Sequence, residues 1–154
     1  MEASDRSGVS VHLSAEGGWS VPKKLLETGV RRAAARGGIG EGEISLTFLG
    51  DGEIRALNLE YLGRDEITDV IAFSLRDPGS AIVGDIYVGY DQARRQADEL
   101  GIALTEELLR LAIHGTLHVT GQDHPAGEDR FDSEMFRLQE EIVRETLPPG
   151  STPA

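Results

Sequence analysis

The sequence predicts an α+β fold in which one mixed β-sheet of about four strands is packed with helices. Segments with the alternating pattern of strands fall mostly in the first half of the chain, and helical segments dominate the second half. The 154 residues contain no internal repeat and no linker-like stretch. We therefore expect a single domain over residues 1–147 and a disordered tail over residues 148–154, with the sequence PPGSTPA.

The first part of the chain is expected to form two strands and two helices. Residues 9–14 (VSVHLS) and 43–50 (EISLTFLG) alternate apolar and polar side chains, as half-buried strands do. Between them, a helix is expected to start after Ser20, a residue suited to capping, and to stop at the Gly-Gly pair 37–38. Residues 51–63 carry apolar side chains at helical spacing, which predicts a second helix.

The second part is expected to form a β-hairpin and then three helices. Residues 68–75 (TDVIAFSL) and 81–90 (AIVGDIYVGY) are rich in β-branched and aromatic residues, and the turn sequence RDPGS joins them. Helices are expected over residues 91–101, 106–121 and 128–147. The middle one carries a strong apolar stripe and ends in glycine, so we expect it to be the central helix.

The amino-acid composition limits which metal ligands the chain can offer and which cellular compartments are expected. The chain has no cysteine, so disulfides and thiolate metal sites are excluded, and nitrogen and oxygen must hold any metal. No apolar run approaches the roughly 20 residues that a membrane span requires. The N-terminus (MEASDRSGVS) lacks the pattern of a secretory signal. We therefore expect a cytoplasmic protein with no membrane partner.

The charge of the chain is unevenly distributed. The formal net charge is -12, and such a surface repels polyanions at long range, which argues against a general nucleic-acid coat. One segment differs, because five bases face a single acid there: Lys23, Lys24, Arg31, Arg32 and Arg36. This basic run predicts either a local basic face or an ordinary solvated helix surface.

Three of the four histidines are crowded into the stretch AIHGTLHVTGQDHP. His114 and His118 are four residues apart in the expected helix, which places both side chains on one face with Cβ atoms about 5–6 Å apart. Gly121 allows the chain to leave the helix and turn back, so that His124 can reach the same ion. We predict that these three imidazoles bind one metal ion.

The chemistry expected of such a site is hydrolysis. Three protein nitrogens leave a fourth tetrahedral position for water, as in a catalytic zinc site. Zinc lowers the pKa of that water to about 7, so a nucleophile is available at neutral pH. The spacing also matches the metzincin protease pattern H-E-x-x-H-x-x-G-x-x-H, except that Gly115 replaces the glutamate that serves as general base. We therefore do not expect a peptidase of that class.

The stretch HGTLHVTGQDH, residues 114–124, resembles the metal motif of the YbeY-type endoribonucleases, a family of ribosomal RNA maturation factors. That motif is close to H-G-x-L-H-L-x-G-Y-D-H, and this chain departs from it at Val119 and Gln122. Three further blocks are similar to the family: LNLEYLGRDEITDVIAF (57–73), GDIYVGYDQARRQADELG (84–101) and EMFRLQEEI (134–142). The resemblance covers about residues 44–142.

The resemblance implies an α+β enzyme that binds one zinc ion per chain and hydrolyses phosphodiester bonds in single-stranded RNA. Its implied roles are ribosomal RNA maturation, including processing of the 16S rRNA 3′ end, and ribosome quality control. RNA is then the expected substrate, with the ribosome or ribosomal proteins as partners. Nickel or another divalent metal also suits three imidazoles. The basic run is the expected contact for the RNA backbone.

Carboxylates are expected behind the metal ligands, because metal-binding histidines usually donate their other N–H to an acceptor. The resemblance places Asp85 and Asp69 near the strands under the site. Asp123, beside His124, is a third candidate, although it also suits a capping role in the turn.

The resemblance also raises a question about catalysis. The family has an arginine directly after the tyrosine of its L-N-x-x-Y block, and Leu62 stands there in this chain. Arg64, two residues on, is the candidate to offset the charge of the phosphate. Two alternatives stay open: a metal-stabilised, ribosome-associated binding factor with weak or no catalysis, and a metallohydrolase of another substrate class.

Overall fold

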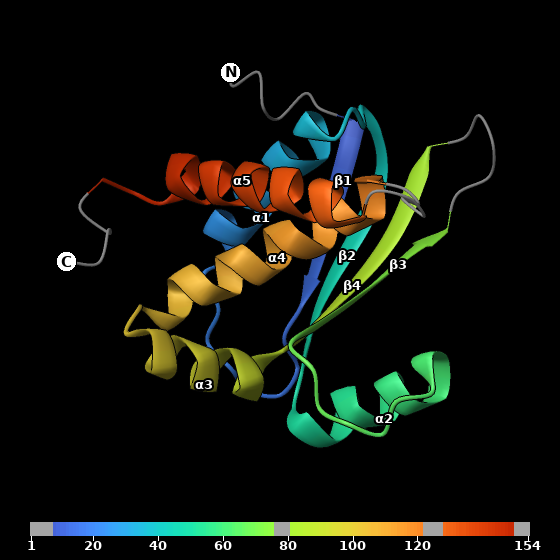
Figure 1. Ribbon diagram of the computed structural model, residues 1–154, viewed down its shortest axis with the longest axis vertical. Helices are drawn as coiled ribbons and strands as arrows, with labels where there is room; N and C mark the ends of the chain where they lie inside the picture. The colour runs from blue at the N-terminus through green and yellow to red at the C-terminus, as the bar shows by residue number, and fades with distance from the viewer. Residues whose placement is uncertain (1–7, 76–80, 122–127, 150–154) are drawn as a thin grey trace.

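The computed structural model of the chain describes residues 8–75, 81–121 and 128–149, with the side chains of residues 128–133 left aside. Its elements form the predicted α+β fold, with one four-stranded sheet (Figure 1). The strands are β1 (Gly8–Ser14), β2 (Glu41–Leu49), β3 (Val70–Leu75) and β4 (Ile82–Gly89). The helices are α1 (Lys23–Arg36), α2 (Asp51–Leu62), α3 (Tyr90–Leu100), α4 (Leu104–Gly121) and α5 (Glu128–Thr146).

The sheet is mixed, with the strand order β1-β2-β4-β3. β1 pairs with β2 and β2 pairs with β4 in parallel, and α1 provides the long connection that a parallel pair needs. β3 runs antiparallel to β4, with Val70 opposite Val88 and Leu75 opposite Val83. This pairing confirms the predicted hairpin, while its turn, residues 76–80, lies outside the described residues. β3 is thus an edge strand.

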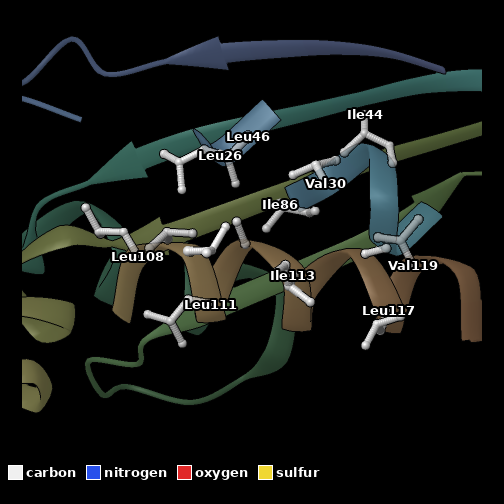
Figure 2. Packing of buried hydrophobic residues seen from close by; sticks show 14 of the residues in the cluster. Leu26, Val30, Ile44, Leu46, Ile86, Leu108, Leu111, Ile113, Leu117 and Val119 are labelled. Atoms are coloured by element: carbon white, nitrogen blue, oxygen red, sulfur yellow. The ribbon is translucent and has the colours of Figure 1, made fainter. Parts of the chain in front are cut away.

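Helices α1, α4 and α5 lie together on one face of the sheet (Figure 1). The core forms between these helices and the sheet, where apolar side chains of α1, β2, β4 and α4 interdigitate (Figure 2). Leu26, Ile44, Ile86 and Ile113 are among its fully buried members. Burying one such side chain contributes about 1.5–3 kcal/mol relative to leaving it exposed. The predicted central position of the helix over residues 106–121 is confirmed.

Glycines allow α4 to approach the sheet closely. A Cβ added to Gly115 would stand 2.6 Å from Cγ2 of Ile86, and one added to Gly84 would stand 2.6 Å from Cγ1 of Val119. Real Cβ atoms essentially never come that close to another heavy atom. The small size of both residues therefore fixes the distance between α4 and β4, and with it the position of any side chain on that part of the helix.

Some element ends differ from the expectation. α1 begins at Lys23, and its N-cap residue Pro22 makes no side-chain cap hydrogen bond, so Ser20 does not cap it. α5 ends at Thr146, and most of the predicted tail, residues 150–154, lies outside the described residues. Among the described helices, none combines the length and apolar character that crossing a membrane would need.

Candidate functional site

A cleft of about 680 Å³ lies between the edge strand β3 and the second half of α4. Its lining comes from three segments that are distant in the sequence: Leu62 at the end of α2, residues 70–74 of β3, and His114, Gly115, His118 and Val119 of α4. Both histidines of the predicted metal motif that the structure describes therefore face one cavity.

The two imidazoles are neighbours across one helical turn. Their ring centroids are 4.6 Å apart, and the ring planes are inclined at 67°. His114 is half-buried and His118 is exposed. This closeness follows from the i, i+4 spacing, and it is a geometry in which two ring nitrogens can bind one ion.

Gly115, between them, leaves no room for a general base. The methyl group Cγ2 of Ile86 occupies the space that a side chain at position 115 would need, so a carboxylate at this position would clash with the sheet. The structure thus gives a physical reason for the departure from the protease pattern. A glutamate here would separate α4 from β4.

The third predicted ligand, His124, and the predicted support residue Asp123 lie outside the described residues. Among the residues that the structure does describe, no group of three His, Asp or Glu side chains converges in a way that could hold a metal ion. The described part of the site is therefore the pair His114–His118 and the groups behind it.

The hydrogen bonding of His114 fits a metal ligand. Its Nδ1 lies 2.5 Å from Oε1 of Gln139, on α5. An amide oxygen can only accept, so Nδ1 carries a proton, and in the neutral imidazole the lone pair then lies on Nε2. Metal-bound histidines in proteins almost always have their second nitrogen held in this way. The residues present therefore suit a divalent metal with a preference for nitrogen, such as zinc.

The sequence patterns did not identify Gln139 as a partner of His114, although its position on an apolar helical stripe is a signal of a buried polar contact. It is only 5% exposed and lies on the buried stripe of α5 together with Met135, Ile142 and Val143. A polar residue on an apolar helical stripe needs a hydrogen-bond partner when it is buried. The pattern alone does not identify that partner.

Asp85 and Asp69, the two predicted carboxylates that the structure describes, interact with other groups. Asp85 follows Gly84 and precedes Ile86, which both face α4, so the alternation of a strand turns Asp85 to the opposite face of the sheet. There it accepts a hydrogen bond from the Ser45 hydroxyl at 2.7 Å. Asp69 precedes β3, and its negative charge contributes to raising the pKa of Glu107, nearer the start of α4.

The predicted phosphate-binding cation is not in the cleft lining. Arg64 is exposed and follows Gly63, which ends α2 in the left-handed conformation. Leu62, two residues earlier, does line the cleft, with about half of its surface exposed. None of the described residues that line the cleft is a lysine or an arginine.

The basic run lies on α1, which packs on β1, α4 and α5 rather than on β3. Three of its members bind other parts of the fold. Arg31 donates to the Val9 carbonyl, and Arg32 donates to the Glu145 carbonyl at 2.7 Å. Arg36 forms ion pairs with α5, the shorter one to Glu141 at 3.0 Å. Lys23 and Lys24 are exposed at the start of the helix. The structure does not bring this run to the cleft.

Comparison with known proteins gives a consistent result. The family model described as endoribonuclease YbeY matches residues 19–147. The endoribonuclease YbeY of Bacillus licheniformis is 40% identical over 133 residues, which cover 79% of this chain and 80% of the relative. That of Thermus thermophilus is 41% identical over 131 residues, covering 79% and 92%. A solution structure of a Thermotoga maritima protein aligns with a TM-score of 0.63 at 29% identity, covering 92% of this chain and 99% of that one.

Proposed function

The chain belongs to the endoribonuclease YbeY family, and from this premise we propose that it is a zinc-dependent endoribonuclease that hydrolyses single-stranded RNA. The proposed roles are ribosomal RNA maturation, including the 3′ end of 16S rRNA, and ribosome quality control. RNA is the proposed substrate, and the ribosome or its proteins are the proposed partners. The observation that carries the proposal is the pair of imidazoles, 4.6 Å apart, that faces the cleft.

The proposed ligands of the metal are His114, His118 and His124. When bound, a zinc ion supplies Lewis acidity and a nucleophilic water at neutral pH. The contribution of the chain is to orient His114 through Gln139 and to place His118 one turn away. The cleft, at about 680 Å³, has the volume of sites that accept a nucleotide-sized ligand.

The apolar side chains of Val70 and Phe73 line the cleft on the side of β3, opposite the histidines of α4. We propose Arg64 as the cation that offsets the charge of this phosphate, because it is exposed and lies two residues from Leu62 in the cleft lining.

A second candidate function rests on Leu62. A leucine in the cleft lining cannot donate a hydrogen bond to phosphate, so the metal site could serve a ribosome-associated binding factor with weak or no catalysis. The two candidates share the fold and the metal site and differ only in turnover.

The test compares His118→Ala with His12→Ala. Both histidines are exposed, so neither substitution removes core packing, and His12 lies on β1, where its nearest partner is Glu43 at 3.6 Å. Elemental analysis and cleavage of a fluorescent single-stranded RNA are measured on each purified protein. We expect one zinc per chain and RNA cleavage in the wild type and in His12→Ala, and the loss of both in His118→Ala.

Other outcomes separate the alternatives. A folded, zinc-loaded wild type that leaves RNA intact supports the binding factor. Hydrolysis of another ester or amide without RNA cleavage supports a different metallohydrolase. A wild type without bound metal after purification and zinc dialysis contradicts the metal site itself.

A further inference from the structure

The contact between His114 and Gln139 has a defined direction. Gln139 donates from Nε2 to Oε2 of Glu140 at 3.0 Å, which leaves its oxygen for the imidazole. The oxygen therefore faces Nδ1 of His114 at 2.5 Å. Since Gln139 is 5% exposed, water has little access to replace either hydrogen bond.

Glu140 is itself held by a charged cluster between α4 and α5. Arg110 donates to both carboxylate oxygens of Glu140, at 2.8 and 2.9 Å, in the two-pronged geometry that is strongest for this pair. Arg110 also donates to Glu106 and Glu107, on the first turn of α4. These hydrogen bonds restrain the orientation of the guanidinium and of the Glu140 carboxylate.

The ionisation of the cluster supports this picture. Hydrogen bonds to Glu140, and then to Glu106 and Glu107, raise the pKa of Arg110 above its ordinary value. Burial acts to raise the pKa of Glu140, but the hydrogen bonds from Arg110 and Gln139 hold it below its ordinary value. Glu140 is therefore a carboxylate at neutral pH and an acceptor only, so the Gln139 amide group must present its nitrogen to it.

We propose that Gln139 is a positioning residue: held by the Arg110–Glu140 pair, it fixes the tautomer and the ring orientation of His114 so that the Nε2 lone pair faces the cleft. This inference rests on the proposed metal site, and it concerns a part of the chain that does not touch the substrate. The chain of contacts runs from Arg110 through Glu140 and Gln139 to the imidazole.

The physical effect follows from the two tautomers of a neutral imidazole. A ring with its proton on Nε2 presents an N–H group to the ion and cannot bind it through that nitrogen. A ring without a hydrogen-bond partner also loses rotational freedom when it binds the ion, and this loss weakens binding. Removing a partner of this kind costs about 10–100-fold in metal affinity in other metal sites. The same range is expected here.

The test uses three variants. Gln139→Met keeps the size of the side chain and removes the acceptor, and Gln139→Asn shortens it so that its oxygen withdraws from the ring. Gln96→Met is the matched control, because Gln96 donates to Glu107 at 2.8 Å in the same cluster and none of its hydrogen bonds is to His114.

Two measurements are made on each protein. Nitrogen-15 NMR of the imidazole side chains, in metal-free protein, reports which ring nitrogen of His114 carries the proton. Competition with a chromophoric chelator reports the dissociation constant for zinc. Because the first measurement needs no metal and no RNA, it decides the inference even if the proposed function fails.

The expected result is an Nδ1–H tautomer of His114 in the wild type and in Gln96→Met, with similar zinc affinities in the two proteins. Gln139→Met and Gln139→Asn are expected to shift the proton toward Nε2 and to weaken zinc binding by about tenfold or more. If Gln139→Met does not fold, the measurements on Gln139→Asn test the inference. An unchanged tautomer with unchanged affinity in either folded variant would overturn the inference.

Discussion

The close approach of α4 to the sheet at Gly115 allows a direct test of how this fold positions the candidate site. Gly115 lies between the two histidines, and a Cβ there would meet Cγ2 of Ile86 at 2.6 Å and Cγ2 of Val70 at 3.4 Å. Ile86 is fully buried on a central strand, so its methyl group has no space into which to move. Gly115→Ala must therefore displace the helix or the strand.

The magnitude follows from two opposing effects. Overpacking a core by one methyl group costs about 1–3 kcal/mol. Replacing glycine by alanine within a helix returns up to about 1 kcal/mol through helix propensity and the lower entropy of the unfolded chain. We expect Gly115→Ala to lower the free energy of unfolding by about 1 kcal/mol net, a fall in Tm of about 2–4 °C for a chain of this size.

A second glycine removes the propensity effect from the comparison. Gly52 lies in the first turn of α2, and a Cβ there would meet no heavy atom within 4 Å. Urea unfolding of metal-free Gly115→Ala and Gly52→Ala should therefore differ by about 1–3 kcal/mol, the cost of the overpacking alone. If Gly115→Ala is as stable as Gly52→Ala, the packing argument is wrong, and the absence of a general base at this position needs another explanation.

Two further predictions concern single charged residues. Arg64→Ala should reduce RNA cleavage roughly tenfold with unchanged zinc content, since an exposed cation contributes less than a buried donor; equal turnover would remove Arg64 from the mechanism. Glu140→Gln should alter the dependence of stability on acid. The folded-state pKa of Glu140 lies below the ordinary 4.5, so its carboxylate stabilises the fold above that value and loses this effect as the pH falls through the folded pKa. The difference in unfolding free energy between the wild type and Glu140→Gln should thus shrink as the pH falls from the unfolded-state pKa of 4.5 through the folded-state pKa in urea titrations, whereas a constant difference would contradict the assignment. Glu107, whose pKa burial raises, is present in both proteins and largely cancels from the comparison.

The elements of this fold were predictable because their signals are local. The β-branched runs on either side of RDPGS predicted the hairpin of β3 and β4, and the pairing confirms it. The apolar stripe before Gly121 predicted the central helix. The neighbouring positions of His114 and His118 follow from the same helical period, so the described half of the candidate site was predictable too.

The contacts behind the site were not predictable, because they depend on which elements meet. Alternation along β4 shows that Asp85 and Ile86 face opposite sides, but it does not show which side α4 covers. Gln139 reaches His114 from 25 residues away, on another helix. The acidic partner of Arg36 lies 105 residues further along the chain, so a basic run in the sequence became a helix–helix contact in the fold.

The ion pairs formed by these arginines affect how a chain with a large negative charge can bind RNA. Of the arginines whose side chains the structure describes, Arg36, Arg55, Arg95 and Arg110 are engaged in ion pairs within the fold. A paired base offers little to a phosphate, and non-specific affinity for nucleic acid comes mainly from neutralising phosphates with free bases. With a net charge of -12, long-range electrostatic repulsion therefore opposes binding of the proposed substrate. We expect short-range contacts in the cleft beside the histidines to offset this repulsion, so the geometry that Gly115 and Gln139 impose there matters for the proposed activity.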